Sequence, residues 1–187
     1  MAEAEVKRVM HHRSGHIYQD RTVTLQFDNA QTSGDVLIRD VITKAPCIIA
    51  LVKNVTRNTI VLCKEFRVGS MREEYGFPAG MIDPGELPIQ AAIREVFEET
   101  GYIAKRITSL GEPVYTSSGF TDEHSYLYYV EVEGDPTGQD LDQDESIEVV
   151  EVSTEDMRAM LDKGEICSAQ ALACLFRYQN RLWTPLF

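Results

Sequence analysis

Apolar residues along the chain follow two periodicities, one typical of strands and the other of helices. Near the N-terminus, residues 21–42 (RTVTLQFDNAQTSGDVLIRDVI) hold two β-rich stretches around a turn cluster at Ser33-Gly34, which predicts a hairpin or meander. Residues 45–66 hold two further apolar runs around an Asn-containing connection. The unbroken apolar run CIIALV predicts a strand that is buried on both faces.

The clearest helical pattern begins at Pro88, because proline is favoured at the first position of a helix. Gly101 predicts its end, since glycine readily takes the left-handed conformation that stops helices. Between them, residues at helical spacing predict one buried stripe, made of Ile89, Ile93, Val96, Phe97 and Thr100.

Strands are expected in residues 107–117, 124–133 and 146–152, with the acidic segment 134–145 before the last of them. Two helices should follow, one between Ser153 and Gly164 and one after Ser168. The last helix is expected to turn its large apolar residues inward, namely Leu172, Leu175 and Phe176. Strands flanked by three helices predict an α/β sandwich around a mixed sheet.

The composition limits the classes of partner that the chain is expected to bind. The 187 residues are 43% hydrophobic and 26% charged, with a formal net charge of −12, which argues against a broad nucleic-acid groove. A small anionic substrate stays possible, because divalent cations can bridge carboxylates to phosphates. The chain has no apolar run long enough for a membrane span, so we expect no membrane partner and a cytoplasmic location.

Three acids gather near the end of the predicted central helix. Glu95, Glu98 and Glu99 lie at i, i+3 and i+4, so their side chains converge on one patch, which we expect to face outward from the core. The negative end of the helix dipole makes this arrangement unfavourable, and only Arg94 compensates it locally. Two explanations stand, a solvated helix face or a site for a hard divalent cation such as Mg²⁺.

The loop before the helix extends this pattern. The spacing is G-x5-E-x7-R-E-U-x-E-E-x-G-U, where U is a large apolar residue. Its slots are filled in register by Gly80, Glu86, Arg94, Glu95, Val96, Glu98, Glu99, Gly101 and Tyr102. This is similar to the Nudix box, and the chain therefore resembles the Nudix hydrolases.

The resemblance implies roles for these residues. Nudix enzymes hydrolyse a nucleoside diphosphate linked to another moiety, with Mg²⁺ or Mn²⁺ as cofactor. Glu86 and Arg94 would tie the loop to the helix first and serve catalysis second. The metal ligands implied by position are Glu95 and Glu99, supported by Glu98 and by the backbone carbonyl of Ala79.

Residues outside the box resemble the ADP-ribose pyrophosphatase branch, over roughly residues 45–180. In that branch an arginine in the strand before the box contacts the substrate, which implies Arg67, although a plain surface charge is the alternative. Gly119 is a further substrate-binding candidate, in a turn where the branch has S-P-G and this chain has S-S-G. The segments that carry the resemblance are KEFRVG, FPAGMIDPGE, YTSSGFTDE, DQDESIEVVEV and GEICSAQALACL.

The general base of that branch lies on an acidic loop, and the matching residue is Glu145. Glu148 is the alternative, but strand alternation turns it toward solvent. Without the resemblance, the acidic run would read as a solvated turn.

The resemblance further implies a Nudix-type α/β/α sandwich in residues 45–187 and a small N-terminal β-subdomain in residues 1–44, which pairs across a homodimer. Tyr18 or Phe27 in that subdomain could stack on a nucleobase, with packing in a core or interface as the alternative.

The function implied is Mg²⁺-dependent cleavage of ADP-ribose or a related nucleoside diphosphate sugar to a nucleoside monophosphate and a sugar phosphate. Alternatives keep the chemistry with another substrate, such as GDP-mannose, UDP-glucose, NADH or an alarmone. A non-hydrolytic Nudix ligand sensor is an alternative of another class.

Overall fold

The computed structural model describes residues 3–14, 18–28, 36–143 and 145–181. The chain forms two compact units. The smaller unit combines residues 1–45 with residues 115–124, and the larger unit combines residues 46–114 with residues 125–187. The second segment of the smaller unit lies far from the first in sequence, so local patterns alone could not assign it.

The smaller unit is built on a three-stranded antiparallel sheet of β1 (Glu3–Ser14), β2 (Gln19–Asp28) and β3 (Val36–Thr43). Its second segment joins this sheet through a bridge between Ile42 and Thr121. The guanidinium of Arg21 also forms an ion pair of 2.7 Å with Asp122.

The larger unit contains an eight-stranded mixed sheet whose main path runs β11-β5-β4-β10-β8. β10 runs parallel to β4, and β5 runs antiparallel to it. The strands are β4 (Cys47–Asn54), β5 (Thr59–Arg67), β6 (Arg72–Gly76), β7 (Ala79–Met81), β8 (Arg106–Ser109), β9 (Val114–Tyr115), β10 (His124–Val132) and β11 (Glu148–Val152).

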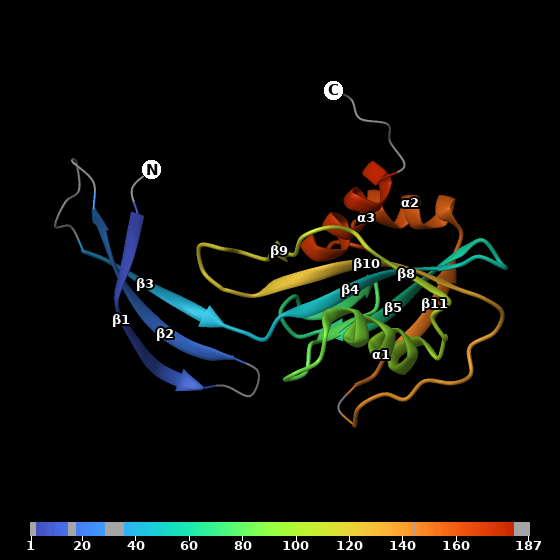
Figure 1. Cartoon of the computed structure of the whole chain (residues 1–187). Helices are drawn as coiled ribbons and strands as arrows, with labels where there is room; N and C mark the ends of the chain where they lie inside the picture. Colours follow the sequence, from blue (N-terminus) through green and yellow to red (C-terminus); the bar gives the residue numbers. More distant parts are fainter. Residues whose placement is uncertain (1–2, 15–17, 29–35, 144, 182–187) are drawn as a thin grey trace. The chain divides into compact units, whose positions relative to one another are not determined.

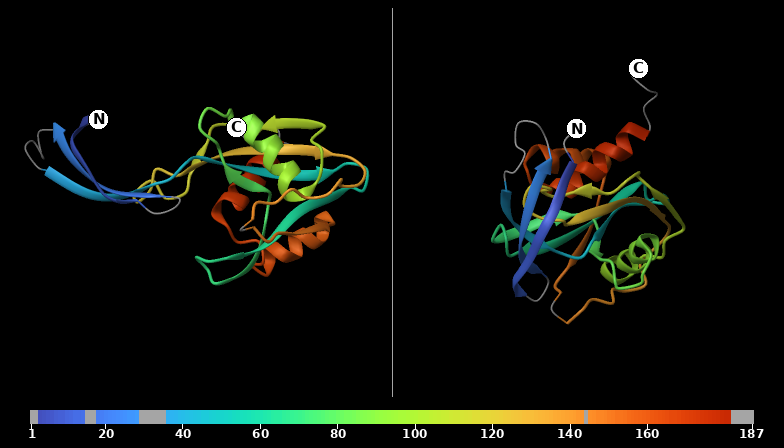
Figure 2. Two further views of the ribbon diagram at one scale, coloured as in Figure 1. Left: turned by 90° about the horizontal axis from the view of Figure 1, so that it is seen from below. Right: turned by 60° about the vertical axis from the view of Figure 1, so that its left-hand side comes forward.

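Three helices cover the two faces of this sheet (Figure 1). α1 (Pro88–Thr100) lies on one face, while α2 (Thr154–Asp162) and α3 (Ala169–Arg181) lie on the other (Figure 2). β4 alternates between two hydrophobic cores, with Ile48 packing on the α1 side and Ile49 on the α2–α3 side. The predicted α/β/α sandwich and the doubly buried CIIALV strand are both confirmed.

The bounds predicted for α1 are confirmed, but its predicted buried stripe is confirmed only for Val96 and Thr100. Ile89, Ile93 and Phe97 are 40%, 45% and 37% exposed. The buried face is rotated toward Ala91 and Ala92, whose small side chains let the helix backbone approach the sheet. The other residues buried on this face are Glu95, Val96, Glu99 and Thr100.

The C-terminal helices also begin as predicted, and Ser153 caps α2 by accepting a hydrogen bond from the backbone N–H of Asp156. On α3 only Leu175 of the predicted inward residues is buried, whereas Leu172 and Phe176 are exposed. The small residues Ala171 and Cys174 take their place in the core.

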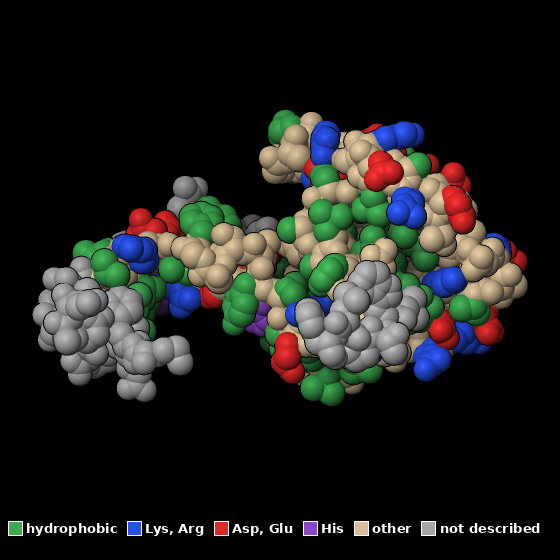
Figure 3. Space-filling view, turned by 90° about the horizontal axis from the view of Figure 1, so that it is seen from above, with side chains coloured by type: hydrophobic (Ala, Val, Ile, Leu, Met, Phe, Trp, Pro, Cys, Tyr) green, Lys and Arg blue, Asp and Glu red, His purple; other side chains and the backbone are tan. Residues whose placement is uncertain are grey.

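Charges are mixed on the face that carries α2 and α3, where basic side chains lie among acidic ones (Figure 3). Among the described residues, no helix is long and apolar enough to cross a membrane.

Gly101 ends α1 in the left-handed conformation, with φ of 71°. A Cβ built there would lie 2.8 Å from backbone atoms of Gly138, so a second segment of chain packs directly on the helix end. Gly164 has nearly the same φ, 70°, but nothing within 4 Å of a built Cβ.

The two glycines form a matched pair for substitution. Gly164→Ala should cost about 1–2 kcal/mol of unfolding free energy, from left-handed strain alone. Gly101→Ala should cost clearly more, because it adds an overlap with Gly138. Chemical denaturation of both variants measures the difference, and equal losses would show that the approach of residue 138 contributes nothing.

Candidate active site

The loop between β7 and α1 is fastened to the helix by one ion pair. The Nε and Nη2 atoms of Arg94 donate to the two carboxylate oxygens of Glu86 at 3.0 and 2.9 Å. The backbone N–H of Asp83 donates to the same carboxylate at 3.0 Å. These contacts lower the pKa of Glu86, with the bonds from Arg94 as the largest cause. The brace implied by the resemblance is present.

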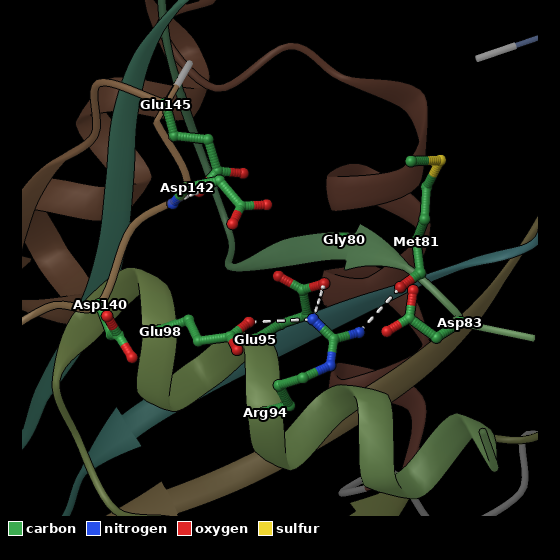
Figure 4. Close-up of a pocket in the computed structure, with 9 residues that line it drawn as sticks. All are labelled: Gly80, Met81, Asp83, Arg94, Glu95, Glu98, Asp140, Asp142 and Glu145. Carbon is green, nitrogen blue, oxygen red and sulfur yellow. Dashed lines mark hydrogen bonds and ion pairs between the residues drawn. The ribbon is translucent and has the colours of Figure 1, made fainter. Parts of the chain in front are cut away.

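Arg94 also contacts two of the helix carboxylates (Figure 4). Its Nη1 donates to Glu95 at 2.7 Å and to Glu98 at 2.9 Å, while Nη2 donates to the carbonyl of Met81 at 3.0 Å. The bonds to Glu86, followed by those to Glu95 and Glu98, outweigh burial and raise the pKa of Arg94. One guanidinium therefore compensates three acids.

The carboxylates do not all face outward, contrary to the sequence-based expectation. Glu95 and Glu99 are only 8% and 4% exposed, on the side of α1 that faces the sheet. Glu99 accepts hydrogen bonds from the backbone N–H of Ala79 at 3.2 Å and from the thiol of Cys63 at 3.3 Å. The correction has a physical reason, since the sheet offers hydrogen-bond donors to Glu99 on the buried side of the helix.

Glycine at position 80 leaves room for the carboxylate of Glu95 in this close packing. A Cβ built there would lie 1.9 Å from Oε1 of Glu95, so any larger residue would displace the carboxylate. The box glycine thus lets the backbone of β7 approach the acid directly.

Burial and mutual repulsion shift the proton affinities of the two inner acids. Burial raises the pKa of Glu99 to about 8, and the charge of Glu95 adds to the rise. Burial also raises the pKa of Glu95, although Arg94 partly opposes it. The raised pKa values mean that the protein alone disfavours the charged forms of both acids, and a bound cation would favour those charged forms.

A cavity of about 250 Å³ opens beside Glu95 and Glu98, whereas Glu99 is not among the residues that line it. The segment before β11 supplies its far wall, so that Asp142 and Glu145 face Glu95 and Glu98 across the space (Figure 4). The carboxylate of Glu145 accepts a hydrogen bond of 3.2 Å from the backbone N–H of Asp142. The lining residues are Gly80, Met81, Asp83, Arg94, Glu95, Glu98, Asp140, Asp142 and Glu145.

Alternate residues of β5 interact with the acids of the site. Cys63 contacts Glu99, Glu65 forms an ion pair with Arg67, and the charge of Glu145 adds to the rise that burial causes in the pKa of Glu65. Arg67 thus belongs to the same surroundings as Glu145, although its side chain is 51% exposed. Glu148 instead forms an ion pair with Lys64, and its side chain is 67% exposed.

The protein-family model of the NUDIX domain matches residues 43–173, which is most of the chain. The chain belongs to the Nudix family.

Relatives and a solved structure agree with this assignment. The ADP-ribose pyrophosphatase of Bacillus subtilis (strain 168) is 31% identical over 155 residues, covering 82% of this chain and 83% of that protein. The GDP-mannose pyrophosphatase of Pectobacterium atrosepticum is 27% identical over 169 residues, covering 84% and 86%. A crystal structure of an ADP compounds hydrolase matches with a TM-score of 0.81 and 22% identity, covering 96% of this chain and 94% of that one, which shows a shared fold. Within the Nudix family, the chain falls in the ADP-ribose pyrophosphatase-like branch predicted from its sequence.

The donor atoms of this Nudix site suit a hard divalent cation, because they are carboxylate oxygens around one cavity. Among the described residues, however, no three His, Cys, Asp or Glu side chains stand together as a complete metal cage. The hydrogen bonds explain this. Arg94 donates to the carboxylates of Glu95 and Glu98. The backbone N–H of Ala79 and the thiol of Cys63 donate to the carboxylate of Glu99. Metal binding would require exchange of these contacts. The residues present fit Mg²⁺ or Mn²⁺ on these grounds.

Three predicted substrate-binding residues belong to the smaller unit. Tyr18 is half-buried just before β2, and Gly119 is exposed in a turn. The backbone of Phe27 lies in β2, but its side chain is outside the described residues.

Some site residues escaped the sequence-based reasoning. Glu65 lies two positions before Arg67 on the same face of β5, so strand alternation could have found it. Asp83, Asp140 and Asp142 lie outside the box pattern, and no spacing signal connects them to α1.

Proposed function

We propose that this Nudix hydrolase uses Mg²⁺, or Mn²⁺ in its place, to hydrolyse ADP-ribose or a related nucleoside diphosphate sugar. The products would be a nucleoside monophosphate and a sugar phosphate. The observation that carries the proposal is the pair of buried acids, Glu95 and Glu99, of which Glu95 lines a cavity together with further carboxylates. Burying two like charges side by side costs stability, and a bound cation would offset that cost.

The ion would be held by Glu95 and Glu99, with Glu98 and the carbonyl of Ala79 in support. When bound, it would neutralise charge on the pyrophosphate and acidify a water molecule. Arg67, a cation in the surroundings of Glu145, would bind a phosphate of the substrate.

Glu145 would act as the general base, since it lines the cavity opposite the box acids. The oxygen of water forms a bond to one phosphorus while the bond between that phosphorus and the bridging oxygen breaks. The proton passes to the Glu145 carboxylate, and the bridging oxygen leaves with the other phosphate. Glu86 and Arg94 would keep the loop and helix in register throughout.

Two sugar nucleotides are the leading candidate substrates. The similarity to an ADP-ribose pyrophosphatase favours ADP-ribose, and the similarity to a GDP-mannose pyrophosphatase keeps that sugar nucleotide as the second candidate. Tyr18 or Phe27 is the proposed stacking partner of the nucleobase, and Gly119 is a further proposed substrate-binding residue. A ligand sensor without hydrolysis is disfavoured, because it would have no need for acids buried at an electrostatic cost.

We also propose a cytoplasmic homodimer, as the resemblance to the branch implies, with the N-terminal sheet as the pairing arm. Light scattering tests this against the 21.1 kDa mass of one chain. A particle of one-chain mass at micromolar concentration would contradict the dimer.

A substrate panel tests the proposed reaction. With Mg²⁺ present, the protein should release phosphate monoesters from ADP-ribose, and chelation of the metal by EDTA should abolish the release. GDP-mannose, UDP-glucose and NADH complete the panel and rank the sugars and bases. If no compound is hydrolysed with either Mg²⁺ or Mn²⁺, the enzyme proposal fails and the sensor takes its place.

Two substitutions separate the candidates for the base. Glu145→Gln should lower kcat by about 10²- to 10⁴-fold with metal binding retained, because the amide cannot accept the proton. Glu148→Gln is the matched control, since its side chain faces solvent beside Lys64, and its kcat should be unchanged. Steady-state kinetics on the preferred substrate provides the comparison, and the reverse order would move the base to Glu148.

A further inference from the structure

The last turn of α1 supplies backbone carbonyls that a helix leaves without partners of its own. The segment before β11 provides the donors. The backbone N–H of Thr137 donates to Gly101 at 2.8 Å, and that of Asp140 donates to Glu98 at 2.9 Å. This segment is therefore docked on the very turn that carries the box acids.

Gln139 has a particular place in this docking. Its side-chain amide nitrogen donates to the carbonyl of Glu99 at 2.6 Å and to the carbonyl of Ile147 at 3.1 Å. The first acceptor belongs to a residue of the metal site, and the second lies just past the segment 140–146 that carries Glu145. One amide group thus fastens both ends of this segment to α1.

Two glycines let the segment before β11 lie close to the end of α1. Gly138, the neighbour of Gln139, has φ of 116°, and its backbone packs where a Cβ at Gly101 would lie. A glycine at each position brings the two backbones within reach, and the amide of Gln139 then completes the junction.

We propose that Gln139 is a positioning residue, which sets the place of Glu145 opposite the box acids by joining the carbonyls of Glu99 and Ile147. This inference rests on the proposed function and extends it. A carboxylate that takes a proton from water must be held within hydrogen-bond reach of it, and Glu145 lies on a segment whose anchorage is this junction.

Kinetics of paired variants tests the proposal. Gln139→Met keeps the length of the side chain but cannot donate, so kcat should fall about 10- to 100-fold while KM changes little. Gln143→Met makes the same change at an exposed position of the same segment and should keep the wild-type kcat. Equal kcat values for the two variants would overturn the proposal.

A double-mutant cycle separates positioning from a general structural effect. If Gln139 acts through Glu145, then Gln139→Met should cost little further kcat in a Glu145→Gln background. The same fold-loss in both backgrounds would contradict this role, because it would show an action independent of Glu145.

Hydrogen exchange makes the test independent of turnover. The backbone amide of Asp140 should exchange faster in Gln139→Met than in Gln143→Met, because the junction that holds its segment on α1 is lost. Unchanged protection would overturn the junction. If the wild-type protein hydrolysed no substrate while this exchange difference was present, the proposed function would fail and the junction would stand.

Discussion

The rest of the site depends on the ion pairs that the guanidinium of Arg94 forms with three glutamates. Three glutamates near the negative end of one helix would repel one another and the helix dipole. Arg94 bonds to Glu95 and Glu98 within the helix and to Glu86 in the preceding loop, so one cation both relieves the repulsion and fixes the loop. Glu99 lies buried against β5 and β7, where burial and the charge of Glu95 raise its pKa, so the protein alone disfavours its charged form.

The fold brings three parts of the chain together around the acids of α1. β7 contributes a glycine so that its backbone can approach Glu95, and β5 contributes Cys63 and Glu65 on alternate positions. The segment before β11 closes the cavity because the free carbonyls at the end of α1 hold it there. The same helix end therefore presents the box acids with its side chains and anchors the opposite wall with its backbone.

Features that depend on residues close together along the chain were predictable from the sequence. Pro88 and Gly101 bound α1 as expected, and the Glu86–Arg94 pair was implied by the box. The buried face of α1 was not, because large apolar side chains suggested a stripe, whereas the sheet selects small residues beside two acids. The partnership of Gln139 with Glu99 and Ile147 joins segments whose approach only the tertiary fold determines.

We propose that the acids of α1 hold a divalent cation, and electron paramagnetic resonance of Mn²⁺ tests this binding. The wild-type protein should reduce the signal of free Mn²⁺. Glu133→Gln, which removes an exposed acid, should bind equally well. Glu99→Gln should bind about tenfold more weakly or worse, because it replaces an anionic ligand by a neutral amide. Equal binding by Glu99→Gln and the wild-type protein, with the fold intact in both, would contradict the account.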